Sequence, residues 1–284
     1  MANDNSDPVF KASRKALLAE YEKNNIQFTA TTRPYKSTQT FEFVVVNTIG
    51  AIAHAVLRAQ TVTEWFSYGR GDQIPIGAGL FGTATDAETN LSKGRRTNGV
   101  EDFIIEGISA TRKCVRVRYA SADVPVLAVD TDVRNAYLGT VCLVDPAAII
   151  MPPQGFSPFN LEDLLFEALK PNLAIEFVWD RRNFIPIGTL DQIPEGGAKS
   201  LLRASGDPRT DNRYKVPEGY VWRRADKPDG DFAVRGTVAD PLVVPINLVT
   251  LPAAQAAATP THIFIDVAIR LHGLGLNQPG QNVG

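Results

Sequence analysis

Residues 262–271 read HIFIDVAIRL, and this stretch decides the fold. Isoleucine or valine occupies each odd position from 263 to 269, whereas the even positions carry Phe264, Asp266, Ala268 and Arg270. This two-residue period is typical of a β-strand with one buried face. Similar short runs, separated by glycine, proline and asparagine, recur from residue 27 onward. The sequence therefore predicts an all-β protein.

Working outward, the pattern predicts strands at 27–30, 40–47, 103–108, 112–119, 126–129 and 138–144, and again at 174–179, 183–187, 219–224, 232–238 and 242–251. Residues 47–66 fit either a helix or a strand. Residues 68–97 are rich in glycine without a clear period, which is typical of a functional or interface loop. Short helices are predicted at 9–24 and at 161–170, the second capped by Asn160.

A stretch with four prolines, DPAAIIMPPQGFSPFN at 145–160, separates two β-rich halves. Such a composition favours a stiff, extended connection. We therefore expect two tandem β-sandwich modules, at 27–150 and 161–273, joined by a linker at 151–160. An N-terminal arm at 1–26 with an amphipathic helix precedes them, and a flexible tail at 274–284 follows.

Composition limits the function. The chain has 284 residues and a formal net charge of -2, and no half is strongly basic, so bulk binding of nucleic acid by net charge is not supported. Cys114 and Cys142 are too few for a disulfide scaffold, and they form either one bridge or two buried thiols. We find no signal peptide and no apolar run of roughly 18–20 residues, so we expect a soluble chain made inside a cell.

Motifs for chemistry are absent or out of context. His54, His262 and His272 have no partner at metal-ligand spacing. A dinucleotide-type GxGxxG occurs at 77–82, with Glu101 and Asp102 about 20 residues on, but a proline-broken stretch precedes it and no amphipathic helix follows. We expect a loop there, no cofactor and no enzymatic activity.

Two acidic turns could hold a hard cation such as Ca²⁺ or could be solvated turns. The better candidate is formed by Asp226, Asp229 and Asp231, and the other by Asp130 and Asp132. Residues 70–72 form the Arg-Gly-Asp tripeptide, which arises often by chance.

Two basic features suggest contacts with other molecules. The helix at 9–24 places Phe10, Leu17, Leu18 and Tyr21 on one face, with Lys11, Arg14 and Lys15 in its first half. This helix either packs on its own core or lies against a membrane, a genome or a neighbouring subunit. Arg112, Arg116 and Arg118 form a basic strand face near Lys93, Arg95 and Arg96, which is either solvated, ion-paired between subunits, or in contact with phosphates.

The arm at 10–21, the β regions at 27–144 and 174–271 and the linker at 145–159 together resemble the major capsid proteins of the double jelly-roll lineage, found in small icosahedral bacteriophages that contain a membrane. The resemblance implies two jelly rolls side by side in each chain. It also implies homotrimers that form pseudo-hexagonal capsomers, with the arm facing an internal lipid membrane and the loops at 68–97 and 199–231 at tower tips or trimer contacts.

The same resemblance implies a structural protein of the virion capsid that is made in the host cytoplasm. Its partners would be further copies of itself, with penton and minor capsid proteins, and without sequence-specific nucleic acid. Two alternatives remain: another virion or appendage sandwich, such as a tail or spike component, and a bicupin-like metal-dependent enzyme, which needs clustered His and Glu ligands.

Overall fold

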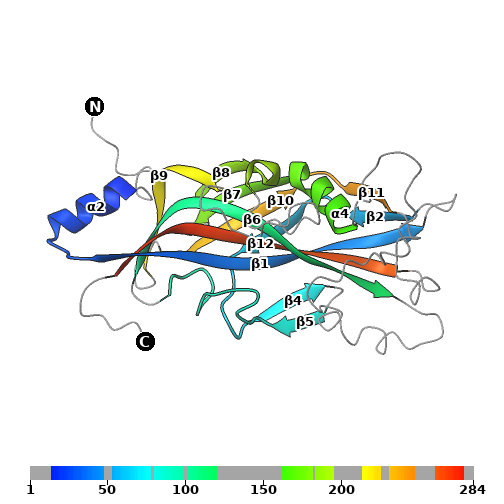
Figure 1. Cartoon of the computed structure of the whole chain (residues 1–284), viewed down its shortest axis with the longest axis horizontal. Helices are drawn as coiled ribbons and strands as arrows, with labels where there is room; N and C mark the ends of the chain where they lie inside the picture. The colour runs from blue at the N-terminus through cyan, green and yellow to red at the C-terminus, as the bar shows by residue number, and fades with distance from the viewer. Residues whose placement is uncertain are drawn as a thin grey trace, which may run out of the picture.

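The protein is mostly β-sheet, and its computed structural model describes residues 14–47, 53–77, 80–98, 101–119, 161–181, 183–194, 213–224, 230–246 and 260–277 (Figure 1). Two α-helices and two 3₁₀ turns are described: α2 (Arg14–Lys23), α4 (Leu161–Leu169), η2 (Lys170–Asn172) and η3 (Leu190–Gln192). The strands are β1 (Thr29–Asn47), β2 (Ala53–Leu57), β3 (Thr61–Trp65), β4 (Gln73–Gly77), β5 (Leu80–Thr83), β6 (Asp102–Tyr119), β7 (Leu173–Trp179), β8 (Asn183–Thr189), β9 (Tyr214–Trp222), β10 (Phe232–Val238), β11 (Leu242–Ile246) and β12 (Pro260–Asn277).

Ten of these strands form two antiparallel sheets that pack face to face. The six-stranded sheet has the order β11-β2-β1-β12-β6-β9, and the four-stranded sheet has the order β3-β10-β7-β8. Eight strands remain when β2, β11 and the separate β4–β5 hairpin are set aside: β1, β3, β6, β7, β8, β9, β10 and β12. If these eight are renumbered 1 to 8 along the chain, the order of neighbouring strands is 1-8-3-6 in one sheet and 2-7-4-5 in the other. This is the strand order of an eight-stranded jelly roll.

The described strands build one jelly roll, so the division into two tandem modules is wrong for them. β1 and β6 come from the first half, yet β12 from the second half lies hydrogen-bonded between them. In the other sheet, β3 pairs with β10 in the same way. A period of two residues identifies strands but does not reveal their partners, so the proline-rich stretch was mistaken for a domain boundary.

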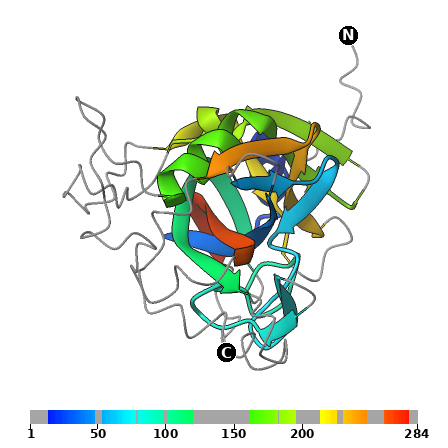
Figure 2. The ribbon, with the colours of Figure 1, turned by 90° about the vertical axis from the view of Figure 1, so that its right-hand side faces the viewer.

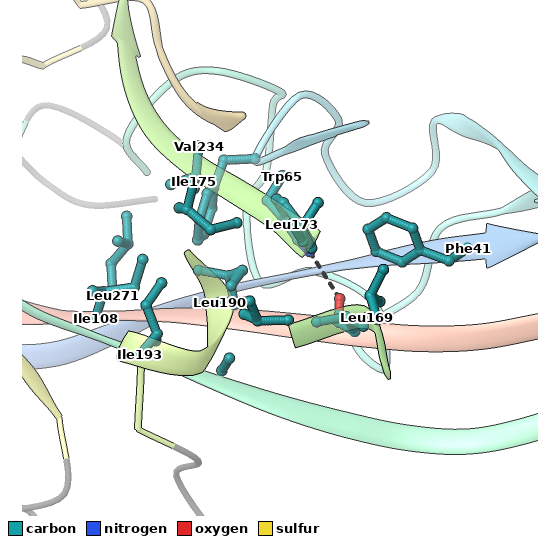
Figure 3. Close-up of a cluster of buried hydrophobic side chains, with 14 of the residues drawn as sticks. Phe41, Trp65, Ile108, Leu169, Leu173, Ile175, Leu190, Ile193, Val234 and Leu271 are labelled. Carbon is teal, nitrogen blue, oxygen red and sulfur yellow. Dashed lines mark hydrogen bonds between the residues drawn. The ribbon is translucent and has the colours of Figure 1, made fainter. Parts of the chain in front are cut away.

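Both sheets contribute to one aromatic core (Figure 3). Trp65 of β3 donates its indole N–H to the Val267 carbonyl of β12 at 2.8 Å, and Trp179 of β7 donates to Val221 of β9 at 3.1 Å. Each of these bonds crosses from the four-stranded to the six-stranded sheet. Buried tryptophan needs such a partner for its N–H, so the two bonds also fix how the sheets stack.

Helix α4 packs beside this core. Leu165, Phe166 and Leu169 are fully buried and belong to the same cluster as the strands. The helix lies over the part of the six-stranded sheet near β11, beside the four-stranded sheet (Figures 1 and 2). The helix predicted at 161–170 is thus confirmed.

Strand β6 contains two irregularities that change which residues face the core. Its pairing with β12 shifts between His272 and Gly273 and again between Ile265 and Val267. Ile105 and Ile108 consequently both face the core, although strict alternation would separate them. Each extra residue of a β-bulge reverses the alternation beyond it.

Helix α2 packs on the outer face of the six-stranded sheet. Leu17 and Tyr21 form a buried cluster with Ile104 of β6, Val221 of β9 and Leu276 of β12. Strand β12 continues to Asn277, which pairs with Thr29, the first residue of β1. The expectation of a loose tail from residue 274 is wrong for residues 274–277, and 278–284 lie outside the described residues.

The segment between β3 and β6 covers the edge of β1 that carries no neighbouring strand. Asn90 exchanges hydrogen bonds with Lys36 and donates to the Pro34 carbonyl, and Thr89 forms a β-bridge with Ser37. Covering an edge in this way protects its backbone groups from other chains. The β4–β5 hairpin extends from the same segment to one side of the sandwich (Figures 1 and 2).

Candidate functional site

The most buried charges lie where β6 begins, at the neighbouring carboxylates of Glu101 and Asp102. Glu101 has no exposed surface, and it accepts hydrogen bonds from the Arg33 guanidinium and the Tyr35 hydroxyl. The Asn98 backbone N–H donates to that hydroxyl at 2.9 Å. Burial raises the pKa of Tyr35, so the phenol stays protonated and can donate. This network ties β1 to the start of β6.

Asp102 binds α2 on the other side of the sheet. Its carboxylate accepts a hydrogen bond from the Tyr21 hydroxyl at 2.6 Å and another from the Arg224 backbone N–H at 2.8 Å. Arg223, whose Nε lies 3.6 Å from Asp102, also donates to both oxygens of Glu20 at 2.9 Å. Burial, followed by the hydrogen bond to Asp102, raises the pKa of Tyr21. Both carboxylates therefore have structural partners.

The predicted contact arm is only partly exposed. Leu17 and Tyr21 are buried against the sheet of their own chain, which confirms the interpretation as a helix packed on its own core and excludes these two as membrane or neighbour contacts. Leu18 is half-buried, whereas Arg14 and Lys15 are exposed. Arg14 lies 3.5 Å from Glu106. Phe10 and Lys11 lie outside the described residues.

The predicted basic strand face is divided by a bulge. Arg112 lies opposite Val267, a core residue, and its guanidinium stacks 5.7 Å from the centre of the Phe166 ring. Arg116 and Arg118 lie opposite Phe264 and His262, which alternate with the core residues of β12. The register of β6 against β12 therefore shifts by one residue between Arg112 and Val115, whereas the prediction of one basic face assumed unbroken alternation. Cys114 lies inside this bulge, and Cys142 lies outside the described residues.

The one described member of the predicted cation site already has cationic neighbours. Asp231 lies 3.2 Å from the Arg95 guanidinium and 3.3 Å from that of Arg181, and Arg95 also binds Glu64. This carboxylate is thus part of an ion-pair network rather than a free ligand. Asp226, Asp229, Asp130 and Asp132 lie outside the described residues. In the part of the chain that the structure describes, no group of three or more potential metal ligands occurs.

The other motifs occupy separate places. His54 of β2 and His262 of β12 lie opposite Val46 and Val44 of β1, whereas His272 lies further along β12, opposite Pro34. The GxGxxG stretch includes the ends of β4 and β5, which pair as a hairpin, so it lacks the strand–turn–helix setting of a dinucleotide site. In the Arg-Gly-Asp tripeptide, Asp72 turns back to accept the Gly69 N–H at 2.7 Å.

The strongest candidate for a functional surface is apolar, and we call it the valine patch: Val44, Val46, Val56 and Val243. Val56 is the direct cross-strand partner of both Val44 and Val243, so β1, β2 and β11 present these side chains on one face. Val46 is 43% exposed and Val243 is 54% exposed. Strand β11 is also the sheet edge among the described strands, so exposed apolar side chains lie beside backbone groups that no other described strand pairs.

Further exposed apolar side chains occur at other margins of the sandwich. Phe81 of β5 is 68% exposed opposite Pro75, Phe184 lies on the edge strand β8, and Val62 lies on the edge strand β3. Single exposed apolar residues are ordinary, but here they occur on three of the four sheet edges and on the hairpin. Such margins are suited to contacts with other protein chains.

Comparison with protein families, with curated proteins and with solved structures finds no match to this chain. No helix among the described residues is both long and apolar enough to cross a membrane. Sequence reasoning did not find the valine patch, because its four members come from 44 to 243 in the chain and only the strand register brings them together. The valines at 44–46 were visible as a strand, but their exposed face was not.

Proposed function

We propose that this chain is a structural subunit that assembles with copies of itself into the capsid of a virion. The observation that carries the proposal is the jelly-roll strand order, 1-8-3-6 over 2-7-4-5. Jelly rolls serve chiefly as viral capsid domains, as lectins and as cupins. The interior and the edges of this sandwich favour the first of these.

The interior of the roll is filled. Trp222 lies 5.0 Å from Phe232 and 5.2 Å from Tyr35, measured between ring centres, and Phe177 and Trp179 continue the cluster. A cupin-type enzyme holds its metal and substrate between the two sheets. Here aromatic rings occupy that space, which favours a building block over a bicupin-like enzyme.

The exposed margins supply surfaces for assembly. The valine patch and the exposed side chains of Phe81, Phe184 and Val62 lie on different sides of the sandwich. A subunit of a closed shell needs several distinct contact surfaces, each of which can be weak because the contacts repeat. Such margins fit this role better than the single binding face of a lectin.

One described roll per chain changes the expected stoichiometry. A pseudo-hexagonal capsomer contains six rolls, so trimers suffice only when each chain provides two. With one roll per chain, six copies, or two homotrimers, complete the hexagon. We propose such homo-oligomers, with penton and minor capsid proteins and an internal membrane as further partners, and the virion as the location after synthesis in the host cytoplasm.

The valine patch provides the test. Val243→Asp places a charge on the edge strand, and we expect it to prevent assembly without unfolding the roll, because Val243 is half-exposed. Light scattering coupled to gel filtration, with negative-stain imaging, measures the assembly state. Ala174→Asp, at an exposed position of the other sheet, is the matched control.

Wild-type and control proteins that form hexagonal capsomers or closed shells, with Val243→Asp remaining monomeric, would support the proposal. A wild-type protein that stays monomeric at all concentrations would contradict it. Fibres or open appendage-like assemblies would instead favour the tail or spike alternative, which uses the same exposed margins.

A further inference from the structure

The middle of the outer face of the six-stranded sheet gathers positive charges from several strands. We call this group the cationic cluster: Lys36 of β1, Arg270 of β12, Lys215 of β9 and Arg213 just before β9, with Ser109 and His272 between them. Arg270 is the direct partner of both Lys36 and Ser109. Gly107 is the partner of both His272 and Lys215. The register therefore places five of these residues on neighbouring positions, and the Arg213 side chain lies against Gly107.

The pairing of Lys36 with Arg270 is unfavourable by itself. Like charges directly opposite each other on antiparallel strands destabilise a sheet. The Lys36 ammonium donates to the Asp86 backbone carbonyl, while the Asp86 carboxylate lies 3.3 Å from Arg70, an exposed pair. An anion bound above the sheet would lower the repulsion between these two cations.

Arg213 is held flat against the sheet at the same place. A Cβ on Gly107 would lie 2.7 Å from the Arg213 side chain, so the missing side chain of Gly107 makes room for the arginine stem. The Arg213 Nε is buried without a hydrogen-bond partner among the described residues. Ser109, itself buried, shares a hydrogen bond of 2.8 Å with Nε2 of His272. The cluster thus offers a guanidinium donor group beside a preformed Ser–His pair.

We propose that the cationic cluster is a binding site for a phosphate group, with Arg213 and Arg270 as the principal donors. Guanidinium groups match the planar, two-point geometry of phosphate oxygens. Lys36 and Lys215 add charge at the rim, and the Ser109–His272 pair forms the floor. The phosphate is either free or part of a nucleic-acid backbone, because both present the same oxygens.

The pKa of His272 provides a readout of phosphate binding at the cationic cluster. Its burial and the nearby charges of Arg213 and Arg270 lower the pKa of His272, so the imidazole is neutral at pH 7. The other charged groups around it are Lys36, Lys215 and the Arg14–Glu106 pair of α2 and β6. A bound phosphate adds negative charge beside the ring and therefore raises the pKa of His272.

The experiment is a titration of the full chain with inorganic phosphate, followed through the imidazole NMR signals. The chain has three histidines, so His54 and His262 are internal controls. We expect saturable shifts at His272 alone and a rise in its pKa. Arg270→Gln and Arg213→Gln should each weaken binding by about tenfold, since each removes a charge-assisted donor. Arg235→Gln, on the outer face of the other sheet, should bind like wild type.

Circular dichroism of each variant separates lost binding from lost folding, and Lys215→Gln at an exposed position gives a milder second test.

A short oligothymidylate distinguishes a free phosphate ion from a nucleic-acid backbone as the ligand. Tighter binding of the oligonucleotide than of inorganic phosphate, lost in Arg270→Gln, assigns the site to a nucleic-acid backbone, and phosphate binding alone assigns it to the free ion. Shifts spread equally over the three histidines, or unchanged binding in both arginine variants, would overturn the proposal. Assembly is measured separately, so either proposal can fail alone.

Discussion

At the scale of single residues, buried phenols link loops and helices to the six-stranded sheet. Tyr68 donates its hydroxyl proton to the Thr38 backbone carbonyl of β1, and the side chain is 8% exposed. Burial raises the pKa of Tyr68 to about 12, against the opposing effect of its hydrogen bonds to Ser37 and Thr38. The folded protein therefore keeps this proton at pH values where an unfolded chain releases it.

We expect this phenol to make stability depend on alkaline pH. Its contribution is complete below about pH 10 and is lost as pH rises toward about 12, which amounts to roughly 3 kcal/mol. Tyr68→Phe should be less stable at pH 8 but should lose less of its remaining stability across this range. Urea unfolding at several pH values measures both effects, and Thr31→Val on exposed β1 is the control. Equal alkaline losses in wild type and Tyr68→Phe would contradict the assignment.

At the scale of elements, α2 shows how far a helical pattern can be interpreted. Spacing alone placed Leu17, Leu18 and Tyr21 on one face, and the structure confirms that Leu17 and Tyr21 are buried. The pattern could not say what covers them. That depends on Ile104, Val221 and Leu276, which are distant in sequence and meet only in the folded sheet.

The docked helix should be sensitive to a single truncation. Leu17→Ala removes a fully buried side chain at the centre of the cluster and should cost about 2–5 kcal/mol of helix docking or global stability. Hydrogen exchange of α2 amides, compared with those of β12, distinguishes local release from global unfolding. Lys15→Ala, at an exposed position of the same helix, should leave exchange unchanged. Protection of α2 that survives Leu17→Ala would argue against this packing.

The boundaries of the strands were easier to predict than which side chains of each strand face the core. Residues 232–238 and 174–179 match β10 and β7 closely, because each carries a clear apolar period between turns. The bulges of β6 were invisible, since an extra residue leaves no fixed signature in composition. As a result, the prediction of one basic face did not include the register shift between Arg112 and Val115. The cationic cluster escaped prediction for a related reason: its members are paired by register, not by sequence spacing.

At the scale of the whole molecule, the two halves of the sequence form one cooperative unit. Each sheet contains strands from both sides of residues 151–160, and these strands share one aromatic core. Separate modules at 27–150 and 161–273 would unfold independently. One jelly roll should instead unfold in a single transition.

Splitting the chain tests this directly. A fragment of residues 1–150 contains β1 and β6 without the β12 strand between them, so we expect it to remain unfolded or to aggregate. The fragment of residues 151–284 should behave likewise, and co-expression of both should restore soluble, structured protein. Circular dichroism and solubility measure the result. Two fragments that each fold alone would support independent modules.

The position of β12 also determines when the sheet can close during synthesis of the chain. β12 is the last described strand to leave the ribosome, yet it fills the gap between β1 and β6, and Thr29 pairs with Asn277. Until it emerges, both neighbours present bare inner edges, and closure over so long a separation is slow. Closure of the six-stranded sheet therefore has to wait for the synthesis of β12, and a product that ends before this strand leaves open edges that invite aggregation. The order of the strands thereby makes closure of the sheet depend on the synthesis of β12.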